Sequence, residues 1–68
     1  PKSELQELAA ANDWRAPDYR LAARSGPHHA PRFVVEVEIG GVGTASAEGL
    51  SKQEAETAAA RALLEKLR

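Results

Sequence analysis

The apolar positions between residues 49 and 68 repeat with the period of an α-helix. They recur at four-residue spacing and form one stripe: Ala55, Ala59, Leu63 and Leu67, with Ala58 and Ala62 beside them. Ser51-Lys52-Gln53-Glu54 has the pattern of a capping box, in which the Ser51 hydroxyl accepts from the Glu54 amide and the Glu54 carboxylate returns to the Ser51 amide. Because most of the stripe is alanine, we expect the backbone of this helix to lie close to a flat sheet face.

A second helix is predicted at the start of the chain, over residues 1–12. Its buried side is marked by apolar residues at three- and four-residue spacing: Leu5, Leu8 and Ala9. Its cap is either a capping box beginning at Ser3 or a residue upstream of the first one. Its other side carries short or polar residues: Ser3, Gln6, Glu7 and Ala10. By itself this pattern indicates a solvated face.

A connection over residues 12–17 leads to the first predicted strand. Trp14, in this connection, is expected to lie partly over the core. The strand, residues 18–24, has alternating apolar positions: Tyr19, Leu21 and Ala23. Residues 25–31 are dense in turn formers and predict a loop.

The clearest strand is predicted over residues 32–39. Its apolar face consists of Phe33, Val35, Val37 and Ile39. Gly40-Gly41 indicates a tight two-residue hairpin turn. Residues 42–48 then form a third, weaker strand, which is rich in small residues and is expected at an edge of the sheet.

This order of elements predicts an α+β fold, α-β-β-β-α, in one domain over residues 1–68. Each strand has only one apolar face, so both helices are expected to pack on one face of a three-stranded antiparallel sheet. The predicted core consists of Leu5, Leu8, Tyr19, Leu21, Phe33, Val35, Val37, Ala55, Ala59, Leu63 and Leu67.

Composition and charge narrow the possible functions. The chain has 68 residues and no Cys, which leaves a small core and excludes disulfides and Cys-based zinc sites. It has no Met even at its start, so we expect a piece of a longer protein. Nine basic and ten acidic residues give a net charge of −1, whereas a nucleic-acid binder usually has a positive excess. Long apolar runs and signal-peptide patterns are lacking, so we expect a cytoplasmic location and no membrane partner.

Several separated segments of the chain resemble the double-stranded RNA-binding domain, in particular the one at the C-terminus of bacterial ribonuclease III. The segments are Pro1-Lys2-Ser3 with Leu5-Gln6-Glu7, Pro17-Asp18-Tyr19, Ser25-Gly26-Pro27-His28-His29 with Phe33, and Ser51-Lys52-Gln53-Glu54-Ala55-Glu56 with Ala58-Ala59. Each is a weak motif alone, but in this order they cover nearly the whole chain. The α-β-β-β-α fold of the family agrees with the order predicted from periodicity.

The resemblance implies that the domain recognises the shape of A-form double-stranded RNA over roughly 16 base pairs. In the family, the first helix enters one minor groove and the loop between the first two strands enters the next. The contacts implied by position are Ser3, Gln6 and Glu7 in the first groove and Pro27, His28 and His29 in the second. This implication replaces the solvated interpretation of the first helix.

The last helix of the family faces the phosphates between the two grooves. By position its contacts here are Lys52 and Gln53. The family often has lysines at both positions and at that of Glu56, so the loss of charge bears on affinity more than on function. Arg32, just before Phe33, is a further candidate contact, with a plain surface arginine as the alternative.

A metal site at His28 and His29 is a rival interpretation of the loop. Adjacent histidines diverge, however, and no further ligand pattern accompanies them. No nucleophile or acid is paired with them either. We therefore assign no catalytic residue, no metal ligand and no cofactor to this chain.

Two other functions compete with RNA binding. The first is protein docking or dimerisation with weak RNA binding, which Gln53 and Glu56 favour and the retention of Gln6, Glu7, His29 and Lys52 opposes. The second is a self-contained enzyme. The resemblance implies that cutting depends on a preceding nuclease domain, which binds magnesium through clustered acidic residues and is expected to make the parent a homodimer. Nothing in this chain resembles that domain, so endonuclease activity is expected of the parent only.

Overall fold

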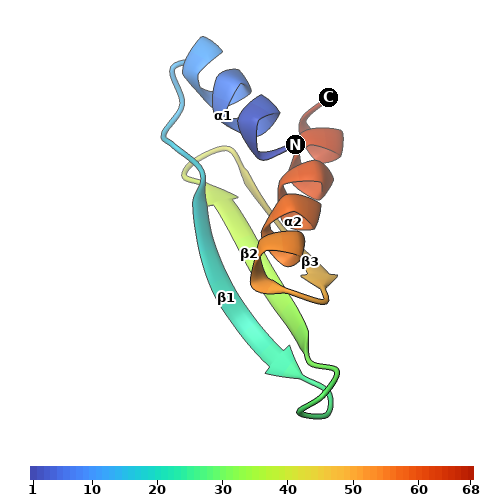
Figure 1. Cartoon of the computed structure of the whole chain (residues 1–68). Helices are drawn as coiled ribbons and strands as arrows, with labels where there is room; N and C mark the ends of the chain where they lie inside the picture. The colour runs from blue at the N-terminus through green and yellow to red at the C-terminus, as the bar shows by residue number, and fades with distance from the viewer.

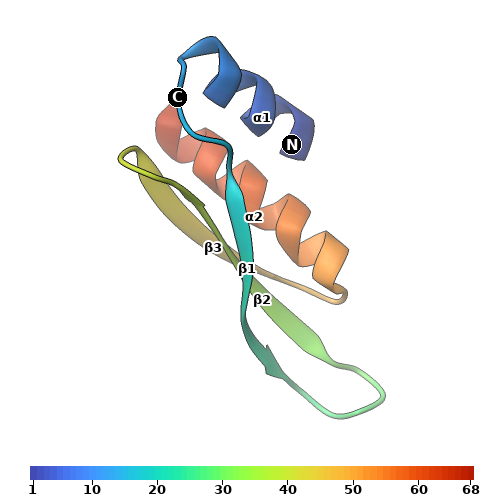
Figure 2. The ribbon, with the colours of Figure 1, turned by 90° about the vertical axis from the view of Figure 1, so that its left-hand side faces the viewer.

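A computed structural model describes all residues of the chain, 1–68. The elements, shown in Figure 1, are α1 (Lys2–Ala11), β1 (Asp18–Ser25), β2 (Arg32–Ile39), β3 (Gly43–Gly49) and α2 (Lys52–Leu67). The strands form one antiparallel sheet in the order β1-β2-β3. Figure 2 shows both helices on the same side of this sheet, with α2 next to the strands and α1 against α2. The predicted fold class and element order are confirmed.

The two helices begin in different ways. At α2, the Ser51 hydroxyl accepts from the Glu54 amide at 3.1 Å, as predicted. The Glu54 carboxylate accepts from the Leu50 amide at 3.2 Å instead of from the Ser51 amide, so the return half of the capping box is shifted by one residue. At α1, the N-cap is Pro1 and no side chain caps the helix. Of the two alternatives for this cap, the capping box at Ser3 is therefore wrong, because Ser3 already lies inside the helix.

The core lies between α2 and the sheet, and α1 closes it at one end. Its buried residues are Leu5, Ala9, Val35, Val37, Ile39, Ala55, Ala59, Ala60, Leu63 and Leu64. Four further residues of the predicted core, and the tryptophan of the connection between α1 and β1, are partly buried against it: Leu8, Tyr19, Phe33, Leu67 and Trp14. Ala60 and Leu64 were not predicted. Each follows a residue of the sheet-facing stripe by one position, so both lie on the neighbouring side of α2, which α1 covers.

Strand β1 departs from the predicted alternation at a bulge. Leu21 pairs with Val35 and Ala23 pairs with Val34, so Ala22 is the extra residue. Leu21 is 45% exposed, and its predicted place in the core is wrong. The reason is that α2 covers β2 and β3 and leaves β1 open at the sheet edge.

The bulge also exchanges the two faces of β1 beyond Leu21. Ala23 now lies on the outer face, opposite Val34, and Arg24 lies on the helix-facing side, opposite Phe33. The predicted pattern had these two side chains the other way round. A single unpaired residue changes the face of every residue after it, because side chains alternate with a period of two.

The turn between β2 and β3 is one residue longer than predicted. It spans residues 40–42 and is closed by the Val42 amide, which donates to the Ile39 carbonyl at 2.9 Å. Gly41 has a φ of 79°, which is the conformation that a type II turn requires at its third position. Strand β3 consequently begins at Gly43 and, as predicted, lies at a sheet edge.

Candidate nucleic-acid interface

The loop between β1 and β2 presents both histidines at its tip. The Ala30 amide donates to the Pro27 carbonyl at 3.0 Å, which places His28 and His29 at the central positions of a turn. Gly26 has a φ of 89°, and a Cβ there would lie 2.8 Å from the Ala30 carbonyl oxygen. Only glycine allows the loop to close in this way. The three candidates Pro27, His28 and His29 are all exposed.

The candidates on α1 gather in one exposed patch. The helix turns its buried side, Leu5 and Ala9, toward the core. On the opposite side a shallow depression is lined by Ser3, Gln6, Glu7 and Ala10. A hydroxyl, an amide and a carboxylate therefore lie next to one another on a rigid element, where they can donate and accept hydrogen bonds.

The first turn of α2 presents Lys52 and Gln53, which are both exposed. Their amides precede the first hydrogen bond of the helix, which the Ala55 amide donates to the Ser51 carbonyl. Free amides and the positive end of the helix dipole suit an anion. Lys52 has no carboxylate within ion-pair distance. The turn therefore offers one full positive charge and two backbone donors.

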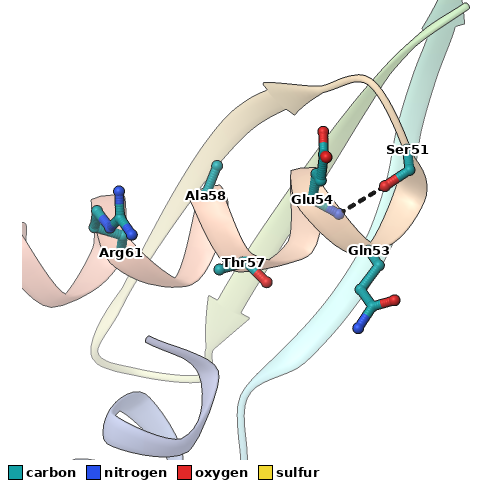
Figure 3. Close-up of a pocket in the computed structure, with 6 residues that line it drawn as sticks. All are labelled: Ser51, Gln53, Glu54, Thr57, Ala58 and Arg61. Carbon is teal, nitrogen blue, oxygen red and sulfur yellow. Dashed lines mark hydrogen bonds between the residues drawn. The ribbon is translucent and has the colours of Figure 1, made fainter.

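The outer side of α2 carries a shallow depression that continues from this turn. Its lining residues are Ser51, Gln53, Glu54, Thr57, Ala58 and Arg61. Figure 3 shows that Gln53 extends from one side of the helix, whereas Glu54 and Ala58 extend from the other. Gln53 is thus directed away from the acidic Glu54. With only one apolar residue, the lining lacks the hydrophobic enclosure typical of small-molecule sites.

Glu56, at the position where the family often has a lysine, is paired within the chain. Its carboxylate accepts from Lys2 Nζ at 2.9 Å, and this hydrogen bond raises the pKa of Lys2. The same ammonium lies 5.0 Å from the centre of the Tyr19 ring. The negative charge beside the α2 turn is thus compensated by a residue of α1. No spacing in the sequence links positions 2 and 56, so sequence reasoning missed this pair.

Arg32 lies apart from the other candidates. It is two residues before Val34 on β2 and so shares the outer face of the sheet. Its guanidinium pairs with Glu48, across from Val34 on β3, at 3.5 Å. The candidates of α1 and α2 lie on the helix side of the sheet, and the β1–β2 loop extends beyond the strand ends. Arg32 lies on the opposite face of the sheet.

The structure also bears on a metal site and on membrane-spanning helices. No group of three or more His, Cys, Asp or Glu side chains is placed to hold a metal ion. None of the helices is both long enough and apolar enough to cross a membrane.

The fold and the three surfaces define an α-β-β-β-α domain of the double-stranded RNA-binding type. The model of the family described as "Double-stranded RNA binding motif" matches residues 1–67, and the chain belongs to this family. The resemblance seen in the sequence is confirmed.

Relatives and solved structures agree with this membership. The chain is 62% identical over 65 residues to a protein of Zymomonas mobilis named Ribonuclease 3, with 96% of this chain and 26% of that protein covered. It is 54% identical over 66 residues to Ribonuclease 3 of Caulobacter vibrioides, with 97% and 29% covered. The chain thus spans less than a third of the length of these relatives. The first dsRBD of protein HYL1 has a TM-score of 0.78 and 32% identity, with 98% of this chain and 94% of that one covered. The structure of both dsRBDs of DRB4 has a TM-score of 0.75 and 37% identity, with 97% and 42% covered.

Proposed function

We propose that this domain binds double-stranded RNA by the shape of its A-form helix. The observation that supports this most strongly is the placement of the three candidate surfaces. Figure 2 shows α1, the first turn of α2 and the β1–β2 loop along the same side of the molecule, which is 41 Å long and only 18 × 16 Å across. Two separated groove contacts with a phosphate contact between them are what a domain reading two successive minor grooves needs.

The side chains suit these roles chemically. The hydroxyl of Ser3, the amide of Gln6 and the carboxylate of Glu7 match 2′-hydroxyls, which both donate and accept hydrogen bonds. Pro27, His28 and His29 form a narrow exposed tip for the second groove. Lys52 and the free amides of the α2 turn bind the phosphates between the grooves. None of these contacts requires a particular base.

We also propose that the domain is the substrate-recognition part of a ribonuclease III that processes double-stranded RNA. The relatives named Ribonuclease 3, at 62% and 54% identity, support this parent. In this proposal the endonuclease activity, its magnesium ions and a homodimer contact belong to a separate nuclease domain, and the parent works in the cytoplasm. This chain holds the RNA and takes no part in the hydrolysis.

Duplex selectivity is the test of RNA-shape recognition. A gel-shift titration of the chain compares duplex RNA, duplex DNA of the same sequence and single-stranded RNA. We expect duplex RNA to bind most tightly, because 2′-hydroxyls and A-form groove spacing are absent from B-form DNA. A duplex RNA of shuffled sequence is the matched control and should bind equally well. Equal affinity for duplex RNA and duplex DNA would contradict the proposal.

Protein docking is the second candidate function. Gln53 and Glu56 favour it, because neither adds a positive charge to the α2 turn. Leu50, 63% exposed just before this turn, would suit an apolar contact. Sedimentation of the free chain, together with the RNA titration, separates the two functions. A dimer without measurable RNA binding would select docking.

A further inference from the structure

The β-bulge in β1 has brought a basic residue to the helix side of the sheet. Arg24 follows the bulge and lies directly opposite Phe33 on β2. Its guanidinium carbon is 5.5 Å from the centre of the Phe33 ring, within cation–π distance. Phe33 is itself partly buried against the core, so the ring provides a fixed support. The Arg24 guanidinium is thereby held over the Phe33 ring.

Arg24 also keeps its charge free. The ion pairs of the chain use four other basic residues: Lys2, Arg20, Arg32 and Arg68. Arg24 is exposed and forms no ion pair or side-chain hydrogen bond. A stacked guanidinium still has donors at its edge, and these match phosphate oxygens in a planar, two-pronged geometry.

The position of Arg24 lies between two of the candidate surfaces. Two residues further along the chain, Gly26 begins the loop that carries the histidines. Across the sheet, Arg24 pairs with Phe33 and Phe33 pairs with Gly49, which is two residues before the α2 cap at Ser51. Strands in a sheet are about 4.8 Å apart, so the backbones of Arg24 and Gly49 are about 10 Å apart.

We propose that Arg24 is an additional phosphate-binding residue of this domain, placed between the histidine loop and the α2 turn. The inference rests on the proposed RNA-binding function and deepens it. Arg24 supplies a positive charge near the α2 turn, where Gln53 and Glu56 supply none. Stacking on Phe33 pre-orders the guanidinium, so less side-chain freedom is lost when a phosphate binds.

Arg24→Gln in a salt titration on one RNA duplex tests the proposal. Each neutralised phosphate contributes about 0.9 to the slope of log affinity against log salt in B-form DNA, a scale borrowed here for duplex RNA. We expect Arg24→Gln to lower this slope by about one unit and to weaken duplexes of all sequences alike. Arg24→Lys should keep most of the slope, because it retains the charge. Thermal midpoints of both variants check that the fold is unchanged.

Arg20→Gln is the matched control. Arg20 lies in the same strand before the bulge, faces Glu36 on the outer side of the sheet and is paired with it. Its substitution should leave the slope unchanged. An unchanged slope in Arg24→Gln, or an equal fall in Arg20→Gln, would overturn the role of Arg24. If the unmodified chain failed to prefer duplex RNA over duplex DNA, the proposed function itself would be wrong, so the two failures are distinguishable.

Discussion

Lys2 Nζ donates to Glu56 Oε1 at 2.9 Å and joins α1 to α2 across 54 positions of sequence. The ammonium also lies over the Tyr19 ring, so three elements meet at one charge. The side chains of Lys2 and Glu56 remain 43% and 20% exposed, which keeps the energy of the pair small. Its position matters more than its strength, because it places a cation of α1 against a carboxylate beside the α2 turn.

A double-mutant cycle on this pair should show a small coupling in stability. We expect Lys2→Met and Glu56→Gln to couple by about 0.2–1 kcal/mol in chemical denaturation. In RNA binding, Lys2→Met should weaken affinity, because it leaves the Glu56 carboxylate uncompensated beside the phosphate site. Adding Glu56→Gln should restore part of the loss. Strictly additive effects on RNA affinity would show that the pair does not act on the interface.

Gly49→Ala should destabilise the fold. A Cβ at Gly49 would lie 2.5 Å from the Ala55 nitrogen, and backbone atoms of a helix cannot move aside. We expect a loss of about 1–3 kcal/mol in the free energy of unfolding, measured by denaturant titration. Gly43→Ala, at the other end of the same strand, is the control. Its Cβ would meet only the Leu63 and Leu67 side chains, at 3.6 and 3.8 Å, so it should be tolerated.

The burial of Tyr19 predicts that the fold loses stability at alkaline pH. Its hydroxyl is buried without a hydrogen-bond partner in the chain. Burial raises the pKa of Tyr19 above its usual 10.0, although the nearby Lys2 ammonium offsets part of this rise. The folded state therefore holds the phenol proton more tightly than the unfolded state. Stability is unaffected below pH 10 and falls as the pH rises through the folded pKa.

Tyr19→Phe tests this behaviour. At neutral pH we expect the free energy of unfolding to rise by about 1 kcal/mol, because a buried, unpaired hydroxyl is removed. Above pH 10 the variant should lose stability less steeply than the unmodified chain. Some loss should remain, since the hydrogen bond to Glu56 raises the pKa of Lys2 above 10.5 and is lost when the ammonium deprotonates. Identical pH profiles would contradict the burial of the phenol.

Most of the fold could be predicted because its signals are local. The strict alternation of β2 and the Ser51 cap of α2 each depend on residues close together in sequence, and both are confirmed. The bulge at Ala22 could not be predicted, since apolar spacing does not report which residue lacks a partner across the sheet. Arg24 was placed on the wrong face of the sheet for that reason. Leu21 was placed in the core for another reason, because the sequence does not show that α2 leaves β1 uncovered. The Lys2–Glu56 pair was missed because it depends on how two distant helices pack.

His29→Ala should weaken RNA binding and leave the fold intact. The residue lies at the exposed tip of a loop and makes no core contact. Loss of one groove hydrogen bond corresponds to about 0.5–1.5 kcal/mol, or a few-fold to about tenfold in affinity. A fluorescence titration with duplex RNA measures the affinity, and a melting curve measures the stability. A sharp fall in the melting temperature would instead make His29 a structural residue.

The first turn of α2 allows opposite effects to be produced by two substitutions. Lys52 and the free amides after Ser51 are the proposed phosphate site, and Lys52 is the only basic side chain in this turn. Lys52→Ala should lower the salt slope by about one unit and weaken all duplexes alike. Gln53→Lys should steepen the slope and raise affinity, because Gln53 projects from the same turn on the side away from Glu54.

The stability cost of Gln53→Lys should be only a few tenths of a kcal/mol, since a cation at a helix N-terminus is mildly unfavourable. A salt titration of the unmodified chain, Lys52→Ala and Gln53→Lys on one RNA duplex makes the comparison. Arg20→Gln serves as the control, because Arg20 lies on the outer face of the sheet, away from α2, and is paired with Glu36. Slopes that stay the same in both Lys52→Ala and Gln53→Lys would remove α2 from the RNA interface. The docking function would then be the better account of this helix, since an exposed Leu50 and a weakly charged turn suit a protein surface.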